Sequence, residues 1–188
     1  MLGIDFCAKI IDGLPFKEGN AYDLVKISKQ YNDIYIKTCG DFGYGPNSFT
    51  LFKLTPELQK VIDNRVLLYT DKTIGLHIRR TDHVDAIGNS PLGLFVDKIQ
   101  AEILNDSSVN FYLSTDDPST ENQLKELFGE RIITYEKDFS RDTPQGIKDA
   151  VLDMYGLANT TKIYGSFNSS FSDVASRIGN IPLHILAT

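Results

Sequence analysis

Apolar positions recur with two different periods along residues 56–188. Short runs rich in β-branched and aromatic residues predict buried strands at 73–79, 109–115, 131–137, 162–167 and 181–186. Between them, apolar residues spaced three and four positions apart predict helices at 93–106, 117–129, 147–158 and 172–180. Strands that alternate with helices in this way are joined by right-handed crossovers into a mostly parallel sheet. The pattern therefore predicts an α/β, Rossmann-like fold with helices on both faces of the sheet.

Capping residues indicate where several of these helices begin. Thr55 and Asp117 are each followed by proline, which pairs a side-chain cap with the residue favoured at the first helical position. Ser172 is the expected cap of the last helix, which should end near Gly179.

The helix at 147–158 shows the clearest apolar stripe, which we expect to face the core. The stripe consists of Ile147, Ala150, Val151, Met154, Leu157 and Ala158. Asp149 and Asp153 lie one turn apart on a neighbouring face, for which solvated surface is the default expectation. The alternative is functional, because a carboxylate can accept both N–H donors on the edge of a guanine.

Residues 1–55 carry a weaker pattern. A helix is expected at 21–31 and a strand at 33–39. The glycine-rich run 40–48 lacks the spacing of a phosphate-binding loop, so an irregular loop is the better interpretation. We therefore divide the chain into an abbreviated N-terminal segment, 1–55, and a Rossmann-like domain, 56–188.

Composition excludes several classes of protein. With 19 basic residues, 25 acidic residues and a net charge of -6, the surface as a whole would repel nucleic acid, while a local basic pocket could still bind a small anion. Cys7 and Cys39 form neither a disulfide framework nor a zinc motif. The N-terminus does not resemble a secretory signal, and no apolar run is long enough to span a membrane. We therefore expect a cytoplasmic protein.

Polar side chains follow three of the expected strands, at the carboxyl edge where parallel sheets bind ligands. The first cluster is HIRRTD at 77–82, in which two arginines end a buried strand. Arginine is a planar, permanently charged fork that can bind two phosphate oxygens and stabilise a diphosphate leaving group. The alternative interpretation is a scaffold ion pair between Arg79 or Arg80 and Asp82 or Asp85.

The second and third clusters add oxygen and amide groups at the same edge. In 114–117, Asp117 is needed as a helix cap, which leaves Thr115 and Asp116 to face a ligand. In 166–172, hydroxyl and amide side chains precede a helix N-terminus, where a phosphate is favoured. The three clusters together predict a binding site for a phosphorylated ligand.

Two metal-site interpretations are weaker. The acidic pair of the second cluster offers fewer oxygen ligands than magnesium normally takes. The histidines and aspartates around the first cluster, His77, Asp82, His83 and Asp85, match no familiar metal-binding spacing. We therefore expect neither a metal nor another cofactor.

Three segments resemble the motifs of one enzyme family. They are GLHIRRTDHV at 75–84, FYLSTDDP at 111–118, and DAVLDMYGLANTTKIYGSFNSSFSDVA at 149–175. Together they are similar to the nucleotide-sugar-binding, C-terminal half of the α-1,6-, protein-O- and nodulation-type fucosyltransferases, GT-B enzymes that use GDP-fucose. The resemblance covers about residues 50–185 and rests most on the H-x-R-R-T-D signature in the first segment.

The resemblance implies a donor site. It implies that Arg79, with Arg80 as a second candidate, contacts the GDP phosphates and the charge that develops on the leaving group. Asp153 would read the guanine, and His77 would line the same site. In full, the residues expected at the nucleotide-sugar site are His77, Arg79, Arg80, Asp82, Thr115, Asp116, Asp117, Asp153, Asn168, Ser169 and Ser170.

The resemblance also implies a reaction: transfer to a glycan acceptor, with inversion at the fucose anomeric carbon and no metal. GT-B enzymes have two Rossmann-like domains around the active site, whereas only about 50 residues precede the nucleotide half here. The leading hypothesis is a bacterial, fucosyltransferase-like enzyme, whose general base would be Asp116 or a carboxylate of residues 1–55. The alternatives are a truncated relative that binds nucleotide without transferring sugar, and a phosphate-binding domain that prefers adenine or uridine nucleotides.

Overall fold

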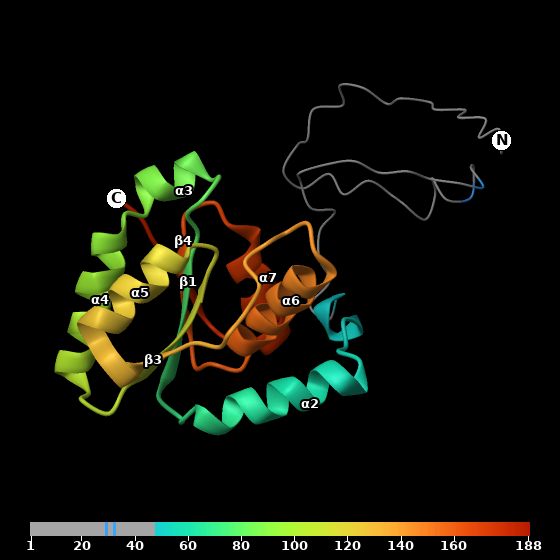
Figure 1. Cartoon of the computed structure of the whole chain (residues 1–188), viewed down its shortest axis with the longest axis horizontal. Helices are drawn as coiled ribbons and strands as arrows, with labels where there is room; N and C mark the ends of the chain where they lie inside the picture. The colour runs from blue at the N-terminus through green and yellow to red at the C-terminus, as the bar shows by residue number, and fades with distance from the viewer. Residues whose placement is uncertain (1–28, 30–31, 33–47) are drawn as a thin grey trace. The chain divides into compact units, whose positions relative to one another are not determined.

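The computed structural model describes residues 29, 32 and 48–188, and the last range forms one compact unit from Phe49 onward (Figure 1). The helix and the strand expected within residues 1–47 lie outside the described residues, apart from single positions. Almost all of the glycine-rich run lies outside them as well.

The centre of the unit is a five-stranded parallel sheet, as the pattern predicts. Its strands are β1 (Thr73–Ile78), β2 (Asn110–Thr115), β3 (Ile132–Ile133), β4 (Ile163–Ser166) and β5 (Leu183–Leu186). They lie in the order β3-β2-β1-β4-β5, and every neighbouring pair is parallel. The chain thus runs outward from β1 through β2 to β3 and then returns to the other side of β1. This reversal favours a crevice between β1 and β4 at the carboxyl edge.

The third strand is shorter than predicted. It ends after two residues, so the prediction of a strand over 131–137 is wrong for most of that run. The chain leaves the sheet because its next side chains have partners elsewhere. The Tyr135 hydroxyl donates to the Arg65 carbonyl, and Lys137 forms an ion pair with Asp153.

Helices cover both faces of the sheet, as expected. The α-helices are α2 (Pro56–Arg65), α3 (Val84–Asn89), α4 (Leu92–Asn105), α5 (Pro118–Phe128), α6 (Pro144–Ala158) and α7 (Ser170–Gly179). Short 3-10 helices are η1 (Ser48–Leu51), η2 (Val66–Leu68) and η3 (Gly129–Arg131). Helices α4 and α5 lie on one face, with α6 and α7 on the other (Figure 1). Within the described part of the chain, no helix has both the length and the apolar character needed to cross a bilayer.

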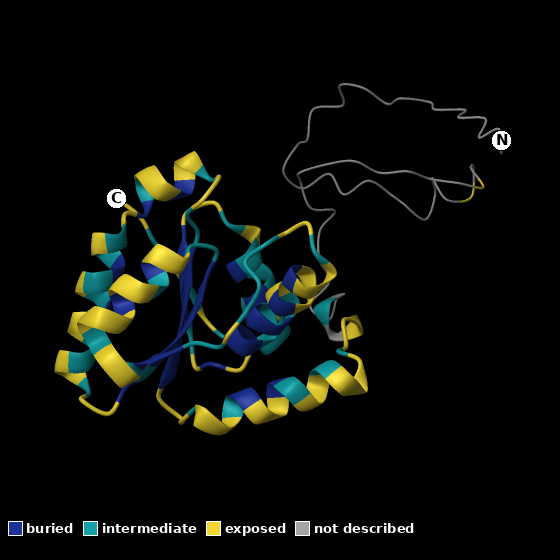
Figure 2. Cartoon of the chain, viewed as in Figure 1, coloured by how far each residue is buried: buried dark blue, intermediate teal, exposed yellow. Residues whose placement is uncertain are grey.

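Two apolar clusters fill the space between the sheet and these helices. Phe111 of β2 belongs to the cluster that includes Leu124 of α5. Its neighbour Tyr112 belongs to the cluster that includes Leu157 of α6. Adjacent strand residues therefore face opposite layers, as strand geometry requires. Strands β1 to β4 are almost entirely buried between the two layers, whereas the edge strand β5 is half-buried to exposed (Figure 2).

Two of the predicted helix caps are confirmed and one is wrong. Thr55 accepts a hydrogen bond from the backbone three residues on, and Asp117 caps α5. The last helix, however, begins at Ser170, so Ser172 lies inside its first turn. Ser172 is fully buried and donates to the Ser169 carbonyl at 3.2 Å. It lies close to β4, since a Cβ on Gly165 would be 2.7 Å from the Ser172 hydroxyl oxygen, and it does not have the capping role that the sequence suggests.

Helix α6 buries a different face from the predicted one. Ile147 is 56% exposed, whereas Asp149 and Asp153 are buried. The default expectation that these aspartates are solvated is therefore wrong, and the apolar stripe is buried only toward its C-terminal end. Gly156 gives part of the reason, because a Cβ there would lie 2.6 Å from an aromatic ring of β2. The helix thus lies against the sheet along a face of small and hydrogen-bonded residues.

Candidate functional site

A cavity of about 400 Å³ opens at the carboxyl edge of the sheet, where the strand order reverses. Its wall comes from the ends of β1 and β2, one face of α6, and the loops after β3 and β4. The wall residues are His77, Arg79, His83, Ser114, Thr115, Asp116, Lys137, Asp138, Phe139, Ser140, Arg141, Gly146, Ala150, Asp153, Asn168, Ser169, Ser170 and Phe171. All three polar clusters of the sequence therefore meet at one cavity.

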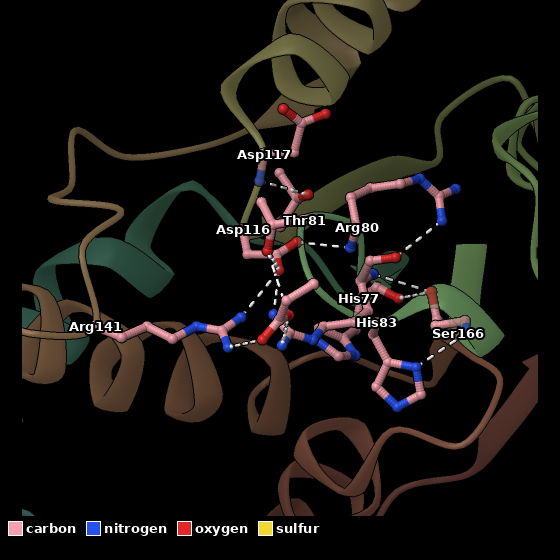
Figure 3. A network of polar contacts seen from close by, with 12 residues as sticks. His77, Arg80, Thr81, His83, Asp116, Asp117, Arg141 and Ser166 are labelled. Atoms are coloured by element: carbon pink, nitrogen blue, oxygen red, sulfur yellow. Dashed lines mark hydrogen bonds and ion pairs between the residues drawn. The ribbon is translucent and has the colours of Figure 1, made fainter.

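Eight of the eleven residues expected at the nucleotide-sugar site lie in this wall. They are His77, Arg79, Thr115, Asp116, Asp153, Asn168, Ser169 and Ser170. Arg80, Asp82 and Asp117 lie outside it. The Arg80 side chain donates to the carbonyl of the preceding residue at 2.9 Å and points away from Arg141 (Figure 3). Asp117 caps α5, and Asp82 lies beside the wall in an ion pair. The binding roles implied for all these residues remain predictions.

Two arginines and two aspartates form a network beside the cavity, and Figure 3 labels one of each, Arg141 and Asp116. Arg79 is ion-paired with both Asp82 and Asp116. Arg141, from the loop after β3, reaches the same two carboxylates at 2.9 and 3.1 Å. The scaffold ion pair between Arg79 and Asp82, which was the alternative interpretation, is therefore present. The two interpretations are compatible, because the same arginine also lines the cavity.

One buried hydroxyl fixes the end of β1 to β4. Ser166 Oγ accepts a hydrogen bond from the Arg79 backbone N–H at 3.0 Å and donates to the His77 carbonyl at 3.3 Å. Ser166 is fully buried. Because the backbone is held at both residues, the Arg79 side chain starts from a fixed position at the cavity.

His77 is a buried, uncharged part of the cavity wall. The residue is 5% exposed, and its ring stacks on Phe171 with the ring centroids 4.9 Å apart. Its Nδ1 atom is buried and has no hydrogen-bond partner among the described residues. Burial is the main cause that lowers the pKa of His77 from 6.5 to about 4. A neutral imidazole with an unpartnered nitrogen is available to a polar group of a ligand.

We expect the free energy of unfolding to fall as the pH is lowered from about 7 to about 5, because of His77. The unfolded chain takes up a proton near pH 6.5, while the folded chain resists protonation until about pH 4, so acid favours unfolding within this window. The stabilising effect is thus present above pH 6.5 and lost as the pH falls toward 4. Between about pH 7 and about pH 5, the free energy of unfolding is expected to fall by about 2 kcal/mol because of His77.

Urea unfolding of the unmodified chain and of His77→Gln at the two pH values measures this effect. The variant lacks the titrating imidazole, so it should lose about 2 kcal/mol less than the unmodified chain on acidification. An equal loss in both proteins would contradict the assignment to His77.

On the α6 side of the cavity, Asp153 is surrounded by hydrogen-bond donors. Its carboxylate accepts from the Tyr112 hydroxyl at 2.8 Å, the Ser114 hydroxyl at 3.1 Å and the Lys137 ammonium at 2.7 Å. Burial raises the pKa of Tyr112, so that hydroxyl stays protonated and donates. A second cation, Arg65, lies 3.7 Å from the carboxylate. Recognition of guanine by Asp153 stays a prediction. The N–H groups of a guanine would have to replace some of the donors that the Asp153 carboxylate now has.

The sequence prediction missed the loop after β3. This loop contributes Lys137, Phe139, Ser140 and Arg141 to the cavity wall. These residues could have been found by the rule that ligands bind at the carboxyl ends of parallel strands, because two cations, Lys137 and Arg141, follow the third strand. The expectation of a strand as far as residue 137 hid that signal.

Buried groups of α6 hold this loop in place. The Asp149 carboxylate accepts from the Asp138 backbone N–H at 2.9 Å, and the Asp138 carboxylate accepts from the Thr143 hydroxyl at 2.5 Å. Gly146 leaves room for the loop, because a Cβ there would lie 1.7 Å from the Ser140 carbonyl oxygen. Asp149 is therefore a buried support for the loop.

The N-terminus of α7 faces the cavity. Asn168 has a left-handed backbone, with φ of 52°, and turns the chain into the helix. Ser169, the cap residue, makes no side-chain hydrogen bond to the first turn. Both residues line the cavity together with Ser170. The backbone N–H groups of the first turn and the positive end of the helix dipole favour an anion at this position.

Within residues 48–188 and the two isolated described positions, no group of three or more His, Cys, Asp or Glu side chains could hold a metal ion. His83, which belonged to the weaker metal-site interpretation, instead accepts a hydrogen bond from the Ala86 backbone at 3.0 Å and caps α3. The expectation that no cofactor is needed stays a prediction.

Comparison with protein-family models and with curated protein sequences finds no match. Comparison with solved structures finds fucosyltransferases. Fucosyltransferase NodZ from Bradyrhizobium is 23% identical, with a TM-score of 0.52 over 68% of this chain and 43% of that chain. POFUT1 in its apo form is 11% identical, with a TM-score of 0.54 over 75% and 49% of the two chains. POFUT1 in complex with GDP-fucose is 10% identical, with a TM-score of 0.53 over 75% and 49%.

These likenesses show the fold. The described unit is an α/β, Rossmann-like domain of the kind present in the fucosyltransferase structures, as the sequence motifs predict. The chain spans about half the length, or less, of the solved structures that it matches.

Proposed function

We propose that the chain binds GDP-fucose, or a related GDP-sugar, in this cavity and transfers the sugar to a glycan hydroxyl with inversion and without a metal. The observation that carries the proposal is the position of Arg79, at the end of the central strand and in the wall of the cavity where the strand order reverses. It is supported by POFUT1, a protein of the same fold that has been solved in complex with GDP-fucose.

The cavity offers two kinds of group that suit a diphosphate. Arg79 would bind phosphate oxygens and offset the charge that develops as the bond to the sugar breaks. The N-terminus of α7, with Ser169 and Ser170, would hold further phosphate oxygens. Since Arg80 does not border the cavity, we assign the phosphate contact within the arginine pair to Arg79.

The guanine of the GDP-sugar would lie at the α6 side of the cavity. Asp153 would accept from the two N–H donors on the guanine edge, in exchange for its bond from Lys137. The released ammonium could then donate to guanine O6, so that both partners of the present ion pair would read the same base. Adenine offers a donor where guanine has O6, which makes it a poorer ligand for this pair.

The acceptor hydroxyl has to lose a proton as it attacks from the face opposite the diphosphate. Asp116 was one expected base, but its carboxylate already accepts from Arg79, Arg141 and the Thr81 hydroxyl. We therefore assign Asp116 to holding the arginines. The other expected base, a carboxylate of residues 1–55, lies outside the described residues and stays a prediction.

Incubation of the full chain with GDP-fucose and a panel of glycans tests transfer, with GDP release and glycan mass as readouts. We expect GDP release that depends on the acceptor, together with a fucosylated product. Binding of GDP-fucose without any product would favour the second candidate function, nucleotide binding without transfer. That candidate is favoured by one observation, that both Arg79 and Arg141 are neutralised by Asp82 and Asp116.

The cytoplasmic location, the bacterial origin and the lack of nucleic-acid binding stay predictions.

A further inference from the structure

The two arginines at the cavity, Arg79 and Arg141, share the same two carboxylates. Asp82 accepts from Arg141 at 2.9 Å, and Asp116 accepts from Arg141 at 3.1 Å. Each carboxylate also accepts from Arg79. Carboxylate oxygens thus lie between two guanidinium groups, where the oxygens of an anionic ligand would bind as well.

The two aspartates are held unequally. The Asp116 side chain is 16% exposed and also accepts from the Arg80 backbone N–H at 2.7 Å and from the Thr81 hydroxyl at 2.6 Å. The Asp82 side chain is 63% exposed, and beyond the arginines its bonding among the described residues is a contact of 3.5 Å from Thr81. Exposed ion pairs contribute little to stability, because solvent screens them and both side chains lose freedom in forming them. Asp82 is therefore the carboxylate that can leave the network at small cost.

Arg141 reaches the network from a supported loop. The Arg141 side chain is 52% exposed and lines the cavity. Its backbone belongs to the segment held by Asp149 and by the close approach at Gly146. An exposed guanidinium on a fixed backbone can turn from a carboxylate to a phosphate by side-chain rotation alone. The loop therefore does not have to refold for Arg141 to contact a ligand.

We infer that Asp82 is an internal competitor of the anionic ligand: it occupies the position between Arg79 and Arg141 that a diphosphate takes, and diphosphate binding displaces it. Arg141 is accordingly a second phosphate-binding arginine. The diphosphate class of the ligand rests on the proposed function. Removal of the Asp82 charge ends both the competition for the arginines and the repulsion between carboxylate and phosphate, so the affinity for the anion rises.

Calorimetric titration of the full chain with inorganic pyrophosphate, and separately with GDP, tests the inference. Asp82→Asn tightens the binding of both probes by roughly fivefold. Asp85→Asn is the matched control, because Asp85 is an exposed carboxylate on the same stretch that pairs with neither arginine among the described residues. This control changes the affinity by less than roughly twofold, because its charge is screened by solvent.

Arg141→Ala completes the test. It weakens pyrophosphate binding by roughly tenfold or more, and in the double variant most of the gain from Asp82→Asn disappears, because the two side chains act on one position. Thermal unfolding of each variant shows whether the fold is intact. Asp82 and Arg141 are both largely exposed, so their replacement leaves the unfolding temperature nearly unchanged.

The outcomes separate this inference from the proposed function. Unchanged or weaker binding of pyrophosphate by Asp82→Asn overturns the inference, even when GDP binds to the unmodified chain. Absence of pyrophosphate binding by both proteins overturns it as well. The expected pattern with pyrophosphate, with no binding of GDP to either protein, supports the inference and contradicts the proposed choice of nucleotide.

Discussion

Replacement of Asp153 by alanine is expected to lower the free energy of unfolding by about 3 to 5 kcal/mol. Asp153 is the buried counter-ion of Lys137 and lies beside Arg65, which is buried as well. Its removal leaves these cations without a carboxylate, and the buried Tyr112 hydroxyl loses its acceptor. Urea unfolding followed by far-ultraviolet circular dichroism measures the change.

Asp142→Ala is the control for this prediction. Asp142 is exposed in the loop before α6, and it is the Asp142 backbone N–H that donates to the Ser140 hydroxyl at 3.2 Å. The free energy of unfolding should therefore change by less than about 0.5 kcal/mol when the side chain is removed. Asp153→Asn keeps the shape of the side chain and an acceptor for Tyr112 but loses the charge. Its loss in free energy of unfolding should therefore lie between the losses of Asp153→Ala and Asp142→Ala. A loss below about 1 kcal/mol for Asp153→Ala would show that the cluster tolerates its excess cations.

Arg79→Ala is expected to weaken GDP binding by about 3 kcal/mol, roughly a hundredfold in the dissociation constant. The variant removes a charge-assisted contact to the phosphates, and it leaves Asp82 and Asp116 with fewer cations beside the ligand. Calorimetric titration of both proteins with GDP gives the difference directly.

Arg80→Ala is the matched control, because Arg80 is the adjacent arginine and its guanidinium lies outside the cavity wall. It should leave GDP affinity within roughly threefold of the unmodified chain. Unchanged affinity in Arg79→Ala, or equal losses in the two variants, would contradict the assignment of the phosphate contact to Arg79.

The sheet and its carboxyl edge could be predicted from the sequence because both depend on local patterns. Alternation of strand and helix periods is enough to define a parallel sheet, and the ends of parallel strands have to meet at one edge. His77, Thr115 and Asn168 were therefore expected together although they belong to three separate motifs, and they do line one cavity.

The buried face of α6 could not be predicted in this way. Periodicity treats aspartate as polar and solvated, yet Asp149 and Asp153 find buried partners from other elements. Those partners include a backbone N–H of the preceding loop and hydroxyls of β2. The sequence pattern of a single helix does not reveal such contacts with other elements. Burial of a charge is decided by tertiary pairing, and not by the spacing of apolar residues.

The same reason explains the shortened third strand and the missed cations. The run at 131–137 has the composition of a strand, but Tyr135 and Lys137 are drawn to α2 and α6. Arg141 was consequently not recognised as a group at the carboxyl edge. The distinction between Arg79 and Arg80 was also open, because β1 ends at Ile78 and alternation no longer fixes the side on which each side chain lies.

Calorimetric titration of the unmodified full chain with GDP, UDP and ADP shows whether this cavity binds a guanosine diphosphate donor. We expect GDP to bind in the micromolar range, with UDP and ADP at least roughly tenfold weaker, because Asp153 and Lys137 suit the edge of guanine. Equal or tighter binding of ADP or UDP, or no binding of any of the three nucleotides, would contradict this expectation.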